Sequence, residues 1–523
     1  MERFLKKSHL LYISWLTLIT LQVSAAPNEQ AYVEGEMIIK FKSDVDQNEE
    51  DVLKRLSEQV AFDQFAKKLE TKAKVEIIKK FEWAKLYHVR VGTWESLDKK
   101  MEEIQALPEV EFVEPNYILS LGSSVEARDY QLDTESPESQ KTNPSLDMNR
   151  VLASCGSMTV AVIDTGADYT HPDLVSNIWR NEKEIPGNGI DDDGNGYTDD
   201  VIGWDFVNGD NDPYDDHYHG THVAGIILSR QDNQHPVIKI MPLKFLNAKG
   251  LGSTGDAIRA IDYAIKNGAR VLNNSWGGGS YSQALRDAII ASYYHNNLFV
   301  VAAGNNSDDI DQRPFYPSSY TVPNMVSVAA LTDAKELAWF SNFGPYTVHV
   351  GAPGISVRSA VPKERCAAPP CYAYLSGTSM ATPYVSGVAA MMFCENQDLM
   401  HLQVKNIIIE TSVSNAALQG KIGKGSVSDN DAFYVASSTT PDTGAIPPYT
   451  PSSIPDAIGL KSGVGLASSP MGCGLVKDIS RGGNDTFSSQ NAVSLFFWMW
   501  PLLFIGLWRS FGKMRRKMLL CEV

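Results

Sequence analysis

Residues 159–166 read TVAVIDTG, an apolar run that ends in an acidic residue, a hydroxyl residue and a glycine. A short apolar run bounded by turn residues is typical of a strand that is buried on both faces. Further apolar runs of this kind occur at residues 238–242, 271–274, 299–303 and 325–329. Helical patterns lie between several of them, at residues 221–228, 255–267 and 281–295. This alternation predicts an α/β fold whose mostly parallel sheet carries helices on both faces.

Three short segments place reactive side chains where such a sheet binds its ligands, beyond the carboxyl ends of the strands. Asp164 ends the first strand, His219 opens the helical segment HGTHVAG, and Ser379 lies in GTSMATP at residues 377–383. The glycine before Ser379 and Pro383 after it are both compatible with a helix start. A serine at this position presents its hydroxyl beside backbone N–H groups and a helix dipole that favour a developing oxyanion. We therefore take Asp164, His219 and Ser379 as candidate catalytic residues.

Each segment also has another interpretation. Asp-Thr-Gly occurs in aspartic proteases, where two such carboxylates share a proton, but no second copy preceded by a strand occurs here. His219 and His222 are three residues apart, whereas zinc metalloproteases use His-Glu-x-x-His. We expect His222 to be a packed, hydrogen-bonded residue. A single serine at a helix start is by default a helix cap. The hypothesis that Ser379 is catalytic therefore depends on the segments that accompany it.

Together, AVIDTG, HGTHVAG and GTSMATP resemble the three signature segments of the subtilisin-like serine proteases, in the Asp, His, Ser order of that family. The resemblance extends over residues 158–436. It includes NNSWGG at 273–278, AAGN at 302–305, FSNFG at 340–344 and GAPG at 351–354. It implies a serine endopeptidase that hydrolyses peptide bonds through an acyl-enzyme and acts on protein or peptide substrates.

The resemblance also implies a role for each candidate residue. His219 would take the proton of Ser379 as a general base, and Asp164 would hold the imidazole in the correct tautomer. Asn305 corresponds to the side-chain oxyanion donor, which acts together with the backbone N–H of Ser379.

The substrate would pair with a chain edge, and the side chain before the cleaved bond would enter a pocket. The residues implied for this edge and pocket are Ser275, Trp276, Gly277, Gly278, Ala302, Ala303 and Gly304. Because these walls are small or rich in glycine, we expect a roomy pocket that favours bulky apolar side chains.

An acidic block at residues 188–200, NGIDDDGNGYTDD, favours a bound cation. Its oxygen donors follow the 1, 3, 5, then Gly rhythm of an EF-hand-type calcium loop, although Ile202 stands at the position of the bidentate Glu. Some subtilisin-like proteases resemble this chain here, with calcium bound in an insertion between Asp and His. The ligands predicted for a structural calcium ion are Asp191, Asp193, Asn195 and Asp199. The alternative is a solvated acidic loop.

The N-terminal part of the chain predicts export and an inhibited precursor. Residues 1–26 have the basic start, short apolar run and small residues of a signal peptide. Residues 27–122 have the alternating patterns of a small α+β module and resemble the family's inhibitory propeptide. Residues 123–145 are predicted to be a linker, 146–436 the catalytic domain, and 437–470 a spacer rich in Pro and Ser.

Residues 471–523 combine an uncharged apolar run at 492–508 with a basic tail, which predicts a membrane-spanning or sorting segment. With Cys473 before the apolar run, this end resembles the sorting signals of Gram-negative surface proteins; a simple tail anchor is the alternative. We therefore expect an exported protein of the cell envelope or the extracellular space, attached to the membrane through its C-terminus.

Composition narrows the function further. The net charge is −16, and no basic stripe offsets it, which excludes nucleic acid as the main partner. Export permits disulfides, and Cys366 and Cys371 flank a loop that can close a small ring, although spacing alone does not establish the pairing. Two rival functions stay open, a catalytically silent surface-binding module and a ligase or maturation protease with the same chemistry.

Overall fold

The computed structural model describes residues 31–43, 52–92, 96–121, 131–132, 155–231 and 237–447. The predicted signal peptide and C-terminal segment, and most of the predicted linker and spacer, lie outside these residues. Of the helices in the described part of the chain, none combines the length and the apolar character needed to cross a membrane.

The central sheet is parallel, with its described strands in the order β13-β12-β11-β10-β6-β8-β7. Its strands are β6 (Met158–Asp164), β7 (Trp204–Asp205), β8 (Ile238–Lys244), β10 (Val271–Asn274), β11 (Leu298–Ala302), β12 (Met325–Leu331) and β13 (Val350–Pro353). Val160 and Val162 of β6 pack into one apolar core, while Ala161 and Ile163 pack into a second core on the other face. Burial of both faces explains why these strands are continuous apolar runs in the sequence.

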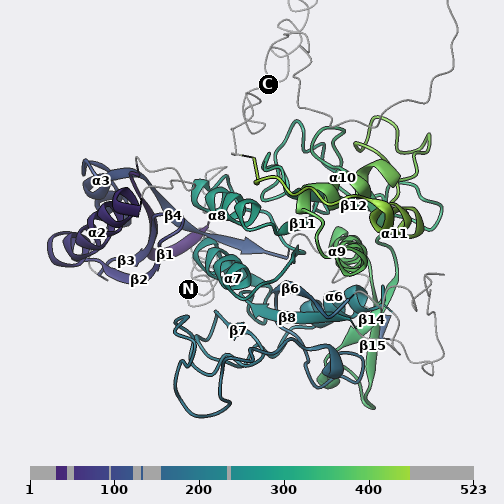
Figure 1. Ribbon diagram of the computed structural model, residues 1–523, viewed down its shortest axis with the longest axis horizontal. Coiled ribbons are helices and arrows are strands. Elements are labelled where there is room, and N and C mark those ends of the chain that lie inside the picture. The colour runs from purple at the N-terminus through teal and green to yellow at the C-terminus, as the bar shows by residue number, and fades with distance from the viewer. Residues whose placement is uncertain are drawn as a thin grey trace, which may run out of the picture. The chain divides into compact units, whose positions relative to one another are not determined.

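Helices cover both faces of this sheet, as Figure 1 shows. The first core contains α6 (His219–Leu228) and α9 (Thr378–Glu395), and the second contains α7 (Thr254–Lys266) and α8 (Gln283–Tyr294). Two more helices, α10 (His401–Thr411) and α11 (Asp429–Ser438), pack against α9. The predicted α/β fold is confirmed, and residues 155–447 are called the α/β domain below.

The described residues between 31 and 121 form an α+β module with an apolar core of its own, called the N-terminal module below. Its strands β1 (Tyr32–Phe41), β2 (Glu76–Phe81), β3 (Leu86–Arg90) and β4 (Val110–Ser120) form an antiparallel sheet in the order β2-β3-β1-β4. The helices are α2 (Val52–Lys68), continued by the π-helical turn η1 (Leu69–Ala73), and α3 (Leu97–Gln105). Phe62 and Ile104 from these helices bury an apolar core against Met37 and Val89 of the sheet.

Two side chains of β4 bind the starts of helices in the α/β domain. The Glu114 carboxylate accepts hydrogen bonds from the Ser282 hydroxyl and from the backbone N–H groups of Gln283 (2.9 Å) and Ala284 (3.3 Å), at the start of α8. Asn116 Oδ1 accepts the backbone N–H of Gly255 at 2.8 Å, at the start of α7. The first N–H groups of a helix have no partner within the helix, so the N-terminal module stabilises both helix starts.

A small antiparallel sheet lies beside the central one and contains β14 (Val357–Val361), β15 (Cys371–Leu375) and β5 (Gln131–Leu132). β5 falls in the region predicted as a linker, so part of that region is ordered against the α/β domain. A disulfide joins Cys366 to Cys371, the pairing that the sequence left open, and a second joins Cys155 to Cys394 at the end of α9. Short 3₁₀ turns complete the described structure at η2 (Val175–Asn177) and η3 (Lys363–Arg365).

Candidate active site

Asp164 and His219 are in direct contact, although 55 residues separate them in the sequence. Asp164 ends β6, and His219 is the first residue of α6. The distance from His219 Nδ1 to Asp164 Oδ1 is 2.8 Å, and both side chains are fully buried. A carboxylate can only accept, so His219 Nδ1 donates, and in the neutral ring the lone pair is then on Nε2.

Ser379 is the second residue of α9, which packs against α6 in the first core. Its hydroxyl donates to the backbone oxygen of Ser275 at 3.2 Å, and the Ser275 hydroxyl donates to the backbone oxygen of Ser379 at 3.0 Å. These bonds join the start of α9 to the segment that follows β10. The structure thus places the candidate serine at a helix start, next to the predicted substrate edge.

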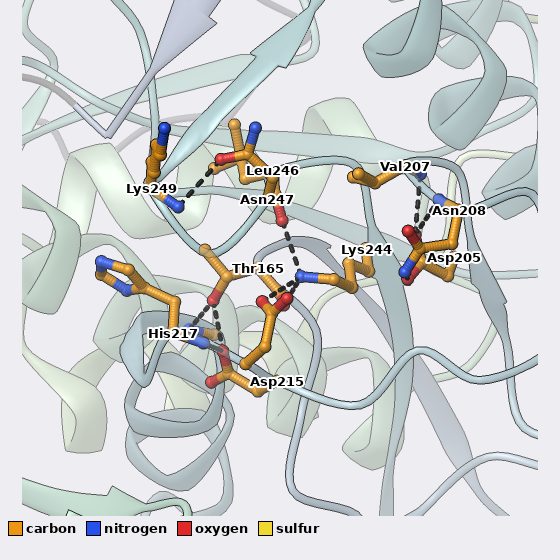
Figure 2. A network of polar contacts seen from close by, with 12 residues as sticks. Thr165, Asp205, Val207, Asn208, Asp215, His217, Lys244, Leu246, Asn247 and Lys249 are labelled. Carbon is orange, nitrogen blue, oxygen red and sulfur yellow. Dashed lines mark hydrogen bonds and ion pairs between the residues drawn. The ribbon is translucent and has the colours of Figure 1, made fainter.

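Asp215 links the strand that carries Asp164 to the helix that carries His219. Its carboxylate accepts the Thr165 hydroxyl at 2.8 Å, as Figure 2 shows. It also accepts the backbone N–H of Thr221 at 2.9 Å. Thr165 follows Asp164 directly, and Thr221 lies in the first turn of α6. Burial raises the pKa of the Asp215 carboxyl, while its hydrogen bonds act in the opposite direction.

The buried side chain of Lys244 holds Thr165 from the other direction, as Figure 2 shows. Its Nζ donates to the backbone oxygens of Thr165 and Leu246, both at 2.9 Å, and forms an ion pair with Asp216 at 2.6 Å. Sequence reasoning did not identify Asp215 or Lys244 as part of the site. Neither residue belongs to a recognisable pattern, because their role depends on what the fold brings beside Thr165.

The amide of Asn305 is oriented by Thr378, the residue before Ser379. Asn305 Oδ1 accepts both the backbone N–H and the hydroxyl of Thr378, each at 2.9 Å. Because Oδ1 is held in this way, Nδ2 forms the donor end on the opposite side of the amide group. Asn305 is 5% exposed and lies three residues after Ala302, the last residue of β11. Thr378 is therefore a site residue that sequence reasoning missed.

The other histidines of this region serve the structure. His222 is buried, and its ring nitrogen Nε2 lies 3.1 Å from the backbone oxygen of Ala373, so Nε2 donates. Burial lowers the pKa of His222 to about 3, which keeps the ring neutral. His222 is thus the packed, hydrogen-bonded residue that the sequence predicted. His217 stacks on Tyr218, and burial lowers its pKa to about 4.

The residues predicted for the substrate edge have different surroundings. Residues 275–278 are called the Gly-rich edge below. Gly277 exchanges two backbone hydrogen bonds with Ser120, the last residue of β4. Trp276, in contrast, is 1% exposed, and its ring packs edge-on against Phe245 with 4.9 Å between the ring centroids. Its side chain therefore belongs to the core.

β4 of the N-terminal module lies between two segments of the α/β domain. On one side it pairs antiparallel with β9 (Leu251–Ser253), and on the other side Ser120 pairs with the Gly-rich edge. Leu119 is 2% exposed and belongs to the same buried cluster as Trp276 and Phe245. The N-terminal module thus fills the predicted edge with an extended strand of its own.

The pocket expected between the Gly-rich edge and residues 302–304 has a neighbour that the sequence did not indicate. A Cβ atom placed on Gly277 would lie 2.4 Å from Phe315 Cε1, and one placed on Gly304 would lie 2.9 Å from the same atom. The Phe315 ring therefore occupies the space between the two walls. We expected a roomy pocket from the small walls alone, and small walls leave space that a side chain from another segment can enter. The preference for bulky apolar side chains stays a prediction.

The acidic loop brings together a different set of carboxylates from the one predicted. Glu184, Asp193 and Asp200 place one oxygen each within 4.8 Å of one another. Glu184 and Asp200 are buried, and within the described residues Glu184 Oε2 has no hydrogen-bond partner. Burial raises the pKa of Asp200, and the nearby Asp193 carboxylate adds to this effect. The group can hold a metal ion, and its oxygen donors suit a hard cation.

Of the predicted ligands, only Asp193 belongs to this cluster. The Asp191 carboxylate accepts the backbone N–H groups of Asn195 and Gly196, and Asn195 donates its side chain to Asp200 at 2.9 Å. The Asp199 carboxylate accepts the backbone N–H groups of residues 188 and 189. Asp200 ends the acidic block at residues 188–200, but it lies outside the 1, 3, 5 rhythm, and Glu184 precedes the block.

Comparisons with known proteins show which family this chain resembles. Residues 156–425 match the subtilase family, and residues 19–116 match the fervidolysin N-terminal prodomain. The chain is 31% identical to a thermophilic serine proteinase of Bacillus sp. (strain AK1) over 411 residues, which cover 77% of this chain and 88% of that protein. It is 34% identical to subtilisin-like protease 1 of Plasmodium berghei, over 52% of this chain and 48% of that protein.

Among solved structures, the chain resembles fervidolysin from Fervidobacterium pennivorans, described as a keratinolytic enzyme related to subtilisin. The TM-score is 0.57 at 23% identity, and the match covers 78% of this chain and 62% of that one. This likeness shows the fold alone.

The family match and the relatives define a serine-type endopeptidase. More particularly, the chain belongs to the subtilase family, and its N-terminal module is a prodomain of the fervidolysin type.

Proposed function

We propose that this protein hydrolyses peptide bonds with Asp164, His219 and Ser379 as its catalytic triad. The observation that carries the proposal is the buried contact between His219 Nδ1 and Asp164 Oδ1, at 2.8 Å, on a helix that packs against the helix of Ser379. This contact leaves His219 Nε2 as the basic nitrogen, which is the nitrogen that a serine hydroxyl requires.

The residues of the chain then act in sequence. Ser379 Oγ attacks the substrate carbonyl carbon while its proton moves to His219 Nε2, and Asp164 stabilises the resulting imidazolium. The negative oxygen of the tetrahedral intermediate accepts hydrogen bonds from Asn305 Nδ2 and the backbone N–H of Ser379. His219 returns the proton to the leaving amine. A water molecule, deprotonated by the same nitrogen, then releases the acyl group from Ser379.

We also propose that the enzyme is made as a precursor that its own prodomain inhibits. β4 occupies the space between β9 and the Gly-rich edge, the position expected for an extended substrate. Because an extended peptide and β4 compete for the same backbone groups, substrates reach the site only after the prodomain has been cut and released.

Glu184, Asp193 and Asp200 would hold a calcium ion in the acidic loop, and the buried oxygen of Glu184 supports this. The ion would offset two of the three negative charges of these carboxylates and stabilise the loop; it would take no part in peptide hydrolysis. From the sequence alone, we propose that residues 1–26 direct export of the enzyme. On the same basis, we propose that residues 492–508 attach it to the cell envelope.

The test of the proposed function uses denatured casein. The matured enzyme should release peptides, and a Ser379→Ala variant, produced as a precursor of the same fold, should release none above the background of the assay. A Ser307→Ala variant is the matched control, because Ser307 is exposed and its hydroxyl binds only the backbone oxygen of Trp339 among its described contacts. Equal hydrolysis by the wild-type and Ser379→Ala proteins would refute the proposal, and a wild-type protein that binds casein without cutting it would favour the silent surface module.

A further inference from the structure

The ring of Phe315 lies between the two walls of the predicted pocket. Its Cε1 atom is the nearest neighbour of the Cβ position on Gly277, at 2.4 Å, and Cζ of the same ring lies 2.8 Å from that position. On the opposite wall, the Cβ position of Gly304 lies 2.9 Å from Cε1 and 3.1 Å from Cδ1. One edge of the ring therefore touches both walls, and only glycine leaves room for it at either position.

The backbone around Phe315 is fixed to the Gly-rich edge. The backbone N–H of Gly278 donates to the backbone oxygen of Tyr316 at 2.9 Å, and Gly279 forms a β-bridge with Tyr316. The backbone N–H of Phe315 itself donates to the Ser319 hydroxyl at 2.9 Å. These hydrogen bonds hold the backbone of Phe315 in a defined position relative to the Gly-rich edge. The ring is therefore a fixed part of the pocket wall.

The inner side of the ring is packed. Phe315 contacts a buried apolar cluster that includes Ala303, Ile310, Leu331 and Leu418. Rotation of the ring out of the pocket would expose this cluster to water, which costs free energy in proportion to the apolar area exposed. We therefore expect the ring to stay in place when a substrate binds.

We propose that Phe315 restricts the side chain before the cleaved bond to Gly, Ala or Ser, an inference that rests on the proposed function and names its substrate class. A bulky side chain would have to displace the ring from between Gly277 and Gly304. Gly122, at the predicted end of the prodomain, directly follows the described residues Leu119, Ser120 and Leu121, and a cut after this glycine would meet the restriction.

A neighbouring cavity provides the alternative outcome. A cavity of about 400 Å³ adjoins the ring, and it is lined by Ser120, Gly278, Gly279, Asn306, Asp308, Arg313, Pro314 and Phe315. If the ring were to move into this cavity, large side chains would enter between the walls. The experiment must therefore measure small and large side chains at the same position.

Quenched peptides with the sequence Leu-Ser-Leu-Xaa-Ser, taken from residues 119–123, provide the probe. Xaa is Gly, Ala, Leu, Phe or Arg. For the wild-type enzyme we expect kcat/KM for the Ala peptide to exceed that for the Phe peptide by about 100-fold or more. This is the discrimination between side chains of different size that an apolar pocket provides. In Phe315→Ala the ratio should fall at least about 10-fold, through a rise in kcat/KM for Phe. Phe315→Leu should lie between the two.

Tyr346→Ala is the matched control, since it removes an aromatic ring that is 77% exposed. It should leave the preference unchanged. Should Phe315→Ala fail to fold, the wild-type profile still decides, because cleavage after Phe or Leu as fast as after Ala overturns the inference. Retained casein hydrolysis in that case would leave the proposed function intact, whereas loss of activity on casein and on every peptide would refute the proposed function itself.

Discussion

Ser120 of the N-terminal module pairs with Gly277 of the α/β domain through two backbone hydrogen bonds, with N···O distances of 3.4 and 3.0 Å. Gly122, at the predicted end of the prodomain, is two positions after Ser120 in the sequence. Ser275, whose backbone oxygen accepts the Ser379 hydroxyl, is two positions before Gly277. In an antiparallel pair, a step forward along one chain corresponds to a step backward along the other. The same offset of two positions therefore assigns Gly122 to Ser275, the residue that contacts the Ser379 hydroxyl.

This agreement predicts that the precursor is cut between Gly122 and Ser123. Mass spectrometry of the mature protein should find Ser123 at its N-terminus, or a residue further along if the exposed end is trimmed later. A precursor with Ser379→Ala should stay uncut when incubated alone. A mature protein that retains residues before Leu121 would contradict the prediction.

Glu114 predicts how the stability of the precursor depends on pH. Burial raises the pKa of its carboxyl to about 7, from an ordinary value of 4.5, although three hydrogen bonds act in the opposite direction. A group whose pKa is raised on folding contributes stability that is complete below pH 4.5 and is lost as the pH rises through 7. The shift corresponds to about 3 kcal/mol.

The measurement compares the urea midpoints of Ser379→Ala precursors with and without Glu114→Gln, between pH 4.5 and 8.5. The glutamine is neutral at every pH, so the variant should gain stability relative to the parent as the pH rises. Ser379→Ala keeps both precursors uncut throughout. A difference that is constant with pH, or that has the opposite sign, would mean that the ionised carboxylate is the form that stabilises the start of α8.

Asn305→Ala should lower kcat about 10²–10³-fold, the range seen when one oxyanion donor of subtilisin is removed. KM should change little, because the negative oxygen exists only after the hydroxyl has attacked. Asn415→Ala removes an asparagine whose amide binds the backbone oxygen of Lys335 instead, and it should keep full activity. If KM rose while kcat stayed constant, Asn305 would bind the ground state and not the oxyanion.

The acidic loop predicts a melting temperature that depends on calcium. Chelation should destabilise the protein, by about 2.7 kcal/mol relative to a calcium concentration 100 times the Kd. Glu184→Gln should lose this response, because its buried oxygen belongs to the cluster with Asp193 and Asp200. Asp199→Asn should keep it, since its carboxylate binds backbone N–H groups of residues 188 and 189. The reverse pattern would favour the ligand set predicted from the loop rhythm.

The sequence predicted those parts of the molecule that local patterns determine. The strand before Asp164, the helix start at His219 and the segment around Ser379 are each continuous, so their residue types reveal them. Phe315 and Glu184 could not be found in this way. Phe315 lies in an irregular segment, and its effect depends on Gly277 and Gly304, which lie 38 and 11 residues away in the sequence. Glu184 meets Asp200 only because the loop between them folds back.

Covalent labelling tests the central claim most directly. The matured enzyme is treated with a fluorophosphonate, which reacts only with an activated serine, and its peptides are examined by mass spectrometry. The account predicts one label for each molecule, on Ser379, and almost none in a His219→Ala variant of the same melting temperature. A label on another serine, or casein hydrolysis that continues while Ser379 stays unlabelled, would contradict it.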